Sequence, residues 1–225
     1  MFPQLTPVVK NLLIVNIVFF IGSNLSPMAY NYLPVFYPDS PFFKIWQVIT
    51  HMFMHADLSH IFFNMFSLVM FGSLIEQVLG PKRFLNLYLL SGLGAWLLQS
   101  GVQGIELYNA TGSFFPLHHS LDLSNLASSN PNLVKEIYTT RMLGASGAVY
   151  GILLSFAYLF PNLPLQFLFI PVPVKAKYMI GGFILLEIYM SISRPGDSVA
   201  HLAHVGGALF GYILLKVWGI KKGLY

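Results

Sequence analysis

Six apolar stretches, separated by polar or proline-containing segments, dominate the hydropathy pattern of the chain. Each is close to the length that an α-helix needs to cross a bilayer core of about 30 Å, given that helices can be tilted and that some spans are shorter than average. Lipid offers the backbone no hydrogen-bonding partner, so segments that cross it must be helical. The pattern therefore predicts six membrane-spanning helices, at Val8–Leu25, Leu58–Leu79, Phe84–Val102, Leu143–Phe160, Tyr178–Ile192 and Val199–Ile220.

The connections between these stretches differ in length and character. The first, Ser26–Asp57, is long and rich in Pro, Tyr and Phe, which favours an amphipathic element in the membrane interface. The third, Gln103–Met142, is polar, whereas the turn at Gly80–Arg83 and the fifth connection, Ser193–Ser198, are short. The fourth contains LPLQFLFIPVPVK, and its prolines forbid a spanning helix there.

Composition supports the membrane class. Of the 225 residues, 56% are hydrophobic and 9% are charged, and the mean hydropathy is +0.67, whereas soluble domains are about 25% charged. We therefore expect an all-α membrane protein whose residues 1–225 form a single membrane-embedded domain, a bundle of six helices. The absence of Cys excludes disulfides and thiolate chemistry. The net charge of +4 is not arranged as a basic patch with aromatic residues, so we expect no nucleic-acid partner.

Basic residues concentrate on one side of the predicted bundle. The positive-inside rule places that side in the cytoplasm, together with both termini. The first apolar stretch lacks a small-x-small cleavage site, so it is predicted to be a retained span, not a signal peptide. The basic side holds eight of the 12 Lys and Arg residues, which are Lys10, Lys82, Arg83, Lys175, Lys177, Lys216, Lys221 and Lys222.

Four polar side chains fall inside the predicted spans, where they are costly and by default indicate function. At 1.5 Å per residue, Asn64, Ser146 and His204 each lie about 8–9 Å below the outer boundary, and His60 lies one turn above Asn64. The helix from Ser146 to Phe160 is only about 22 Å long. The loop before Ser146 must therefore dip into the membrane beside protein or a water-filled cavity.

The segment LGASGAVYG contains the first candidate for chemistry, Ser146. A serine hydroxyl needs a base to become a nucleophile. Its small neighbours Gly144 and Gly147 permit close approach of a substrate backbone, and a helix N-terminus favours a developing oxyanion. The alternative is a motif for helix packing, because Gly147 and Gly151 have the small-xxx-small spacing.

The segment AHLAHVGGALFG supplies a candidate base. His204 is followed by Gly207 and Gly211 on its own helix face, which permits contact with another small-faced helix. We therefore predict that His204 is the base. His201 lies nearer the surface and is the second candidate for the base, but a structural hydrogen-bonding role is favoured for it.

The segment HADLSHIFFNMFSL places His60 and Asn64 one turn apart on one face. Both side chains can donate hydrogen bonds, as an oxyanion hole requires. One alternative is a polar pair that holds two helices together. Another is a metal site at His51, His55 and His60, which is disfavoured because no acidic ligand stands at HExxH spacing.

Taken together, these motifs resemble the rhomboid family of intramembrane serine proteases, from about Trp46 to Gly211. The resemblance implies a six-helix core and a serine–histidine dyad, with Tyr150 packed against the catalytic histidine. The family often has Trp-Arg in its first loop, where this chain has Trp46-Gln47, which puts the anchoring of that loop in doubt. No acidic residue is firmly assigned as a third member. Glu187 in the fifth span lies near the same depth, where it could orient a histidine or line a gate, and a packing or gating role is favoured because the family usually works as a dyad.

The function implied by this resemblance is serine endopeptidase activity against transmembrane protein segments, without cofactor or metal. The family's substrates enter from the lipid, usually between the second and fifth spans, and must unwind because a helix hides its carbonyl groups. A rival interpretation is an inactive rhomboid relative that binds or escorts membrane proteins. Another is a transporter with broken helices, which usually shows inverted repeats that are not visible here. The minimal six-span form is typical of prokaryotes, so a bacterial plasma (inner) membrane is expected.

Overall fold

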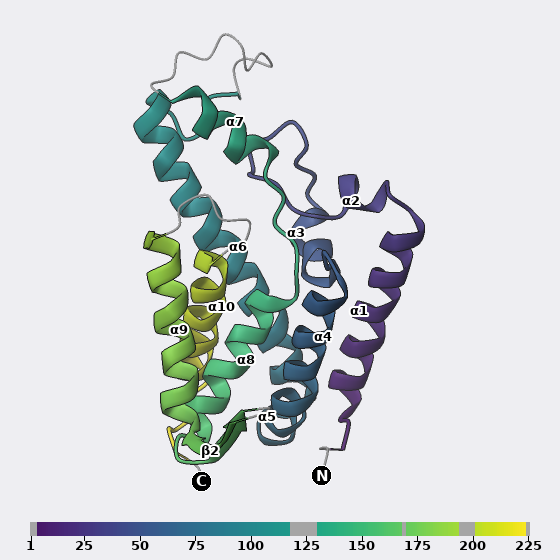
Figure 1. Cartoon of the computed structure of the whole chain (residues 1–225), viewed down its shortest axis with the longest axis vertical. Coiled ribbons are helices and arrows are strands. Elements are labelled where there is room, and N and C mark those ends of the chain that lie inside the picture. Colours follow the sequence, from purple (N-terminus) through teal and green to yellow (C-terminus); the bar gives the residue numbers. More distant parts are fainter. Residues whose placement is uncertain (1–3, 118–129, 168–169, 194–200, 224–225) are drawn as a thin grey trace.

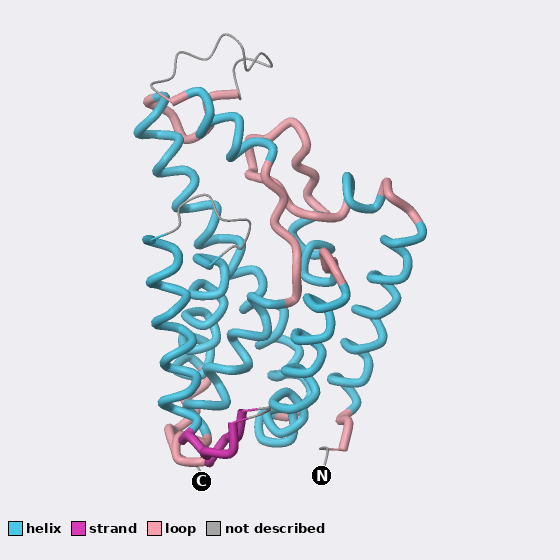
Figure 2. The backbone as a smooth tube through the Cα atoms, in the orientation of Figure 1, coloured by secondary structure: helices cyan, strands magenta, loops and turns pink. Residues whose placement is uncertain are grey.

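The computed structural model describes residues 4–117, 130–167, 170–193 and 201–223 of the chain. Within these ranges it is a bundle of helices with a small hairpin at one end (Figures 1 and 2). The helices of the bundle are α1 (Pro7–Leu25), α4 (Leu58–Ser67), α5 (Ser73–Leu79), α6 (Pro81–Thr111), α8 (Ser146–Leu159), α9 (Ala176–Ser193) and α10 (His201–Val217).

Apolar length identifies the membrane-spanning elements. Three helices, Pro7–Leu25, Leu58–Leu79 and Ala176–Ser193, are long and apolar enough to cross a membrane, and Leu58–Leu79 is continuous because the π-helical turn η2 (Leu68–Gly72) joins α4 to α5. Helices α8 and α10 are apolar but shorter. The protein is therefore a helical membrane protein, as the sequence predicted.

Several predicted boundaries were wrong. Helix α8 begins at Ser146 and not at Leu143. Helix α6 does not end at Val102 but continues to Thr111, because no proline occurs between Val102 and Gly112, and Gly112, with its φ of 79°, ends the helix. The last helix ends at Val217, before Gly219 with its φ of 67°. The predicted start of that helix at Val199 lies outside the described residues.

The fourth connection forms an antiparallel hairpin of β1 (Pro164–Phe167) and β2 (Ile170–Lys175). A two-stranded hairpin tolerates proline because each strand has an edge that needs no donor. The hairpin lies at the same end of the bundle as both chain termini (Figure 1). This is the side on which the basic residues were counted.

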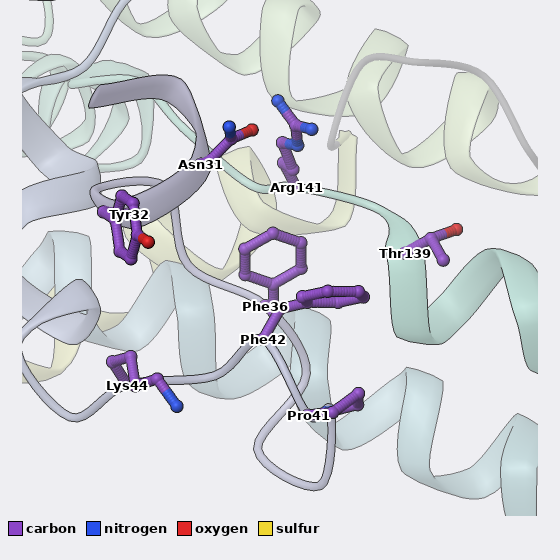
Figure 3. A pocket seen from close by; sticks show the side chains of 8 residues that line it. All are labelled: Asn31, Tyr32, Phe36, Pro41, Phe42, Lys44, Thr139 and Arg141. Carbon is purple, nitrogen blue, oxygen red and sulfur yellow. The ribbon is translucent and has the colours of Figure 1, made fainter. Parts of the chain in front are cut away.

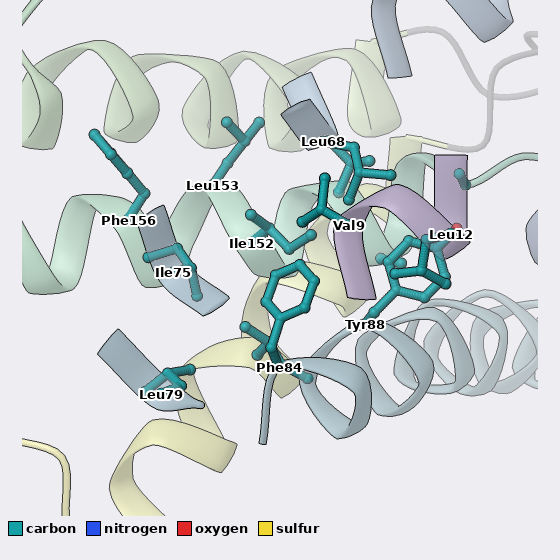
Figure 4. Close-up of a cluster of buried hydrophobic side chains, with 14 of the residues drawn as sticks. Val9, Leu12, Leu68, Ile75, Leu79, Phe84, Tyr88, Ile152, Leu153 and Phe156 are labelled. Atoms are coloured by element: carbon teal, nitrogen blue, oxygen red, sulfur yellow. The ribbon is translucent and has the colours of Figure 1, made fainter. Parts of the chain in front are cut away.

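Helices α6, α8 and α10 make the most extensive contacts with one another and form the centre of the bundle. Helix α9 packs on α10 and α8 at one flank, and α1 packs along α4 and α6 at the other (Figure 1). The apolar core joins α1, η2, α5, α6 and α8 (Figure 4). Its most prominent side chains are Val9, Leu12, Leu68, Ile75, Leu79, Phe84, Tyr88, Ile152, Leu153 and Phe156.

The outer loops hold four short helical elements: α2 (Ala29–Tyr32), α3 (Gln47–Thr50), η1 (His51–Phe53) and α7 (Pro131–Thr139). Gln47 is completely buried; its Oε1 accepts the Lys44 amide at 2.9 Å, and its Nε2 donates to the Phe42 carbonyl at 3.1 Å. The concern about loop anchoring at this position was therefore wrong, because the amide side chain fastens the loop without a charge.

A cavity of about 530 Å³ lies among these outer loops (Figure 3). It is separate from the residues that the sequence selected for chemistry. Its lining residues are Asn31, Tyr32, Phe36, Pro41, Phe42, Lys44, Thr139 and Arg141.

Candidate active site

Ser146 is the first residue of α8, at the end of a segment that descends from α7 into the bundle (Figure 1). Backbone pairing between Met142 and Val35, together with a 2.9 Å hydrogen bond from the Gly144 amide to the His51 carbonyl, holds this segment. Gly144 has a φ of 128°, a backbone conformation that residues other than glycine rarely adopt. The dipping loop expected from the short helix is therefore present.

Ser146 and His204 are brought together. The Oγ atom of Ser146 lies 2.7 Å from Nε2 of His204, which comes from α10. His204 is only partly buried, with 13% of its side chain exposed. The hydroxyl donates to Nε2 when the ring proton is on Nδ1, and this is the arrangement in which an imidazole can accept the serine proton.

Close contact of α8 with α10 makes this distance achievable. A Cβ atom on Gly207 would collide with the Gly147 backbone, and one on Gly211 would lie 2.8 Å from the Gly151 carbonyl oxygen. The predicted contact between these two small-residue faces is confirmed. The helix-packing and chemical interpretations of this segment are thus compatible, because glycine packing of α8 on α10 allows Ser146 to reach His204.

Tyr150 lies one turn after Ser146 and stacks on His204. Their ring centroids are 4.5 Å apart and the planes differ by 8°. Such a flat contact fixes the plane of the imidazole while leaving its two nitrogen atoms accessible at the ring edge. The packing that the family resemblance implied for Tyr150 is present.

His60 flanks the same position. A Cβ atom on Gly144 would lie 2.8 Å from His60 Nε2 and 3.6 Å from Ser146 Oγ, so imidazole and hydroxyl both border that glycine. The Ala56 amide donates to His60 Nδ1 at 3.4 Å, which favours the tautomer with a proton on Nε2. A donor therefore faces the space beside Ser146.

Asn64 lies one turn deeper on α4 and is buried, with 6% exposure. No protein group among the described residues accepts a hydrogen bond from its Nδ2 atom. A buried donor without a partner costs about 1–3 kcal/mol. Such donors in native structures often serve a function that the resting state does not show.

Glu187 of α9, for which the sequence favoured packing or gating, touches this site. Oε1 accepts a hydrogen bond from the Tyr150 hydroxyl and lies 3.0 Å from His204 Nδ1. Oε2 lies 2.6 Å from His201 Nδ1. The structural hydrogen bond expected of His201 is present. The only signal in the sequence for Glu187 was an acidic residue in a span at the depth of His204.

The structure does not support the metal alternative at His51, His55 and His60. His51 Nδ1 lies 2.8 Å from the Gln47 carbonyl, and burial lowers the pKa of His51 to about 4. Among the described residues, the potential ligands that converge are instead Glu187, His201 and His204. The hydrogen bond between Glu187 and His201 and the close approach of Glu187 to His204 account for this arrangement without an ion.

The fold and the paired side chains define a helical membrane protein with a serine and a histidine in contact at the head of an inner helix. The rhomboid domain family matches residues 43–220, which is most of the chain, so this protein belongs to the rhomboid family.

Individual relatives agree with this assignment. The chain is 31% identical over 185 residues to RHOMBOID-like protein 12, mitochondrial, of Arabidopsis thaliana, covering 81% of this chain and 48% of that protein. It is 28% identical over 179 residues to rhomboid protease AarA of Providencia stuartii, covering 75% and 54%. Inactive RHOMBOID-like protein 8 of Arabidopsis thaliana is 34% identical over 87 residues, covering 38% and 24%. The chain thus spans about half the length of the first two relatives.

Proposed function

We propose that this protein is an intramembrane serine endopeptidase that cleaves transmembrane segments of other membrane proteins. The observation that carries the proposal is the 2.7 Å contact between Ser146 Oγ and His204 Nε2 at the head of a helix within the bundle. Similarity to a relative named a protease supports the reaction class.

In the proposed reaction, His204 removes the hydroxyl proton of Ser146 while Oγ of Ser146 attacks a peptide carbonyl carbon. The resulting oxyanion is stabilised by the Ser146 amide, which is unpaired at the helix N-terminus, and by donors from His60 and Asn64. The imidazolium of His204 then protonates the leaving amine. Water, deprotonated by His204, hydrolyses the acyl-enzyme and restores the serine.

The proposed substrates are membrane-spanning segments, because the site lies within a bundle whose outer surface is apolar. Access from the lipid beside α9 fits the small share of that helix that is buried. A substrate helix must unwind before its carbonyl reaches Ser146, so helix-breaking and small residues should mark cleavage sites. The expected bacterial inner membrane gains no support from the comparisons, since the Arabidopsis relative with the longest match reported above is named mitochondrial.

The proposal is tested by labelling the purified protein with a fluorophosphonate and by following cleavage of a model transmembrane substrate. Wild type should be labelled and should cut, and Ser146→Ala should do neither. Ser155→Ala is the matched control, because Ser155 is buried in the same helix and only bonds the Gly151 carbonyl. Labelling or cleavage that survives in Ser146→Ala would refute the assignment of the nucleophile.

One relative is named inactive, so a protein that binds or escorts membrane proteins without cutting them is the alternative function. The same experiment separates the two. A folded wild-type protein that is neither labelled at Ser146 nor able to cleave any model transmembrane substrate would favour the alternative.

A further inference from the structure

The Glu187 carboxylate is the acidic group that touches the proposed dyad, and the reaction described above does not use it. Only 12% of its side chain is exposed. Neighbouring residues on α9 face outward, with Leu185 68% and Leu186 56% exposed. The carboxylate therefore points into the bundle, where a charge is costly unless other groups compensate it.

Three side chains surround this carboxylate. The Tyr150 hydroxyl donates a hydrogen bond to Oε1, and the His201 ring nitrogen Nδ1 lies 2.6 Å from Oε2. These two contacts come from α8 and α10 and fix both oxygen atoms. If Glu187 served only to hold α9 against α8 and α10, these two contacts would be sufficient.

The third contact is with the proposed base. His204 lies between two groups, with Nε2 2.7 Å from Ser146 Oγ and Nδ1 3.0 Å from Glu187 Oε1. The second contact is an electrostatic approach and not an aligned hydrogen bond, since Nδ1 lacks a partner of good geometry. Hydrogen bonds in resting sites commonly align only when the reaction proceeds.

This order of groups has a chemical consequence. If His204 accepts the serine proton at Nε2, its own ring proton must be on Nδ1, which faces the carboxylate. A carboxylate in that position selects the required tautomer and stabilises the imidazolium that forms when the serine is deprotonated. Loss of such an acid in a soluble serine protease costs about 10⁴-fold in kcat.

We propose that Glu187 is a positioning residue for the reaction, which orients His204 and stabilises its charged form, and that Tyr150 and His201 hold the carboxylate in place. The inference rests on the proposed function. It extends the serine–histidine pair to a serine–histidine–glutamate array supplied by α8, α10 and α9.

The test compares Glu187→Gln with wild type in the full-length protein, by the rate of fluorophosphonate labelling and of substrate cleavage as a function of pH. The groups that face His204 are Ser146 and Tyr150 from α8, Glu187 from α9, His201 from α10 and His60 from α4. Of these, Glu187 is the acid.

We expect Glu187→Gln to lower the cleavage rate by about 10- to 10³-fold, less than in a soluble triad because the resting contact is not aligned. The pH dependence of its cleavage rate should differ from that of wild type, because a neutral amide replaces the carboxylate that faces His204.

Glu76→Gln is the matched control for a buried carboxylate with a structural role. Glu76 accepts hydrogen bonds from Thr6 and from the Val8 and Val9 amides, far along the chain from the dyad. This variant should lower the unfolding temperature and leave the pH profile of the folded protein unchanged. If Glu187→Gln behaves in the same way, Glu187 is only a helix tie and the inference is overturned.

A second pair of variants decides the matter if Glu187→Gln does not fold. His201→Asn places an amide nitrogen where Nδ1 was and should keep the carboxylate in place, whereas His201→Ala removes that contact. We expect near wild-type cleavage for Asn and a loss of about tenfold or more for Ala, with the same change in pH profile. Equal rates and profiles for both would overturn the inference. Absence of Ser146-dependent labelling in wild type would instead overturn the proposed function, and this inference with it.

Discussion

Replacing Asn64 by Ala should reduce activity without reducing stability. The side chain is buried and its Nδ2 atom donates to no protein group among the described residues. Truncation therefore removes no intramolecular hydrogen bond made by that nitrogen. If the donor serves an oxyanion that forms only during the reaction, its loss is felt in the transition state alone.

The expected magnitudes follow from these two states. Loss of one oxyanion donor costs about 2.7–4 kcal/mol in the transition state, or about 10²- to 10³-fold in kcat. In the resting state, removal of an unpartnered buried donor relieves a penalty of about 1–3 kcal/mol, which offsets the smaller apolar area that alanine buries. The unfolding temperature should therefore stay close to that of wild type.

Asn16→Ala provides the matched control. Asn16 is also a buried asparagine in a spanning helix, but its Nδ2 donates to the Leu12 carbonyl at 2.8 Å and lies 3.3 Å from the Tyr88 hydroxyl. Its replacement should lower stability by about 0.5–1.5 kcal/mol for each hydrogen bond removed and leave kcat unchanged. The assay is cleavage of a transmembrane substrate, normalised to the fraction of protein that a fluorophosphonate labels, alongside thermal unfolding. If Asn64→Ala instead lost stability and kept its kcat, Asn64 would be a helix-packing residue and the oxyanion assignment would be wrong.

Two further predictions concern the frame of the site. Gly207→Ala should abolish labelling of Ser146 and lower the unfolding temperature, because the new methyl group meets the Gly147 backbone. The control is Gly182→Ala on α9, where a Cβ atom meets nothing within 4 Å, and it should change neither quantity. A fully labelled Gly207→Ala protein would contradict the packing argument. Acidification below about pH 6.5 should lower the unfolding temperature, because burial lowers the pKa values of His51 and His55 from 6.5 to about 4, so the unfolded chain binds more protons there. A flat unfolding temperature between pH 7 and pH 5 would refute this.

The sequence was sufficient for the main helices of the bundle. Apolar length alone located these helices, since a backbone in lipid has no alternative to a helix. The shortness of the fourth span predicted that the chain dips before Ser146, and spaced glycines predicted which helix faces touch. These inferences depend on local composition and on the rise of a helix, which a single sequence contains.

Other features depended on information that the sequence does not carry. The rotation of α9 about its axis decides whether Glu187 faces lipid or the dyad, and a helix that is apolar all round gives no sign of it. Gln47 replaced an expected charge, and only the positions of three backbone groups show that a neutral amide can satisfy the same loop. The extension of α6 to Thr111 required knowing that Gly112, and no earlier residue, adopts the left-handed conformation.

The buried polar side chains at the proposed site differ from two that lie elsewhere in the bundle in where their contacts come from. Elsewhere, backbone groups are among the main partners: Asn16 Nδ2 donates to a carbonyl one turn away, and Glu76 accepts amides from the first turn of α1. At the proposed site, the side chains of Ser146, His204 and Glu187 contact one another across three helices. Side chains that bond one another across helices can exchange protons and partners without unravelling a helix, and reaction chemistry requires that freedom.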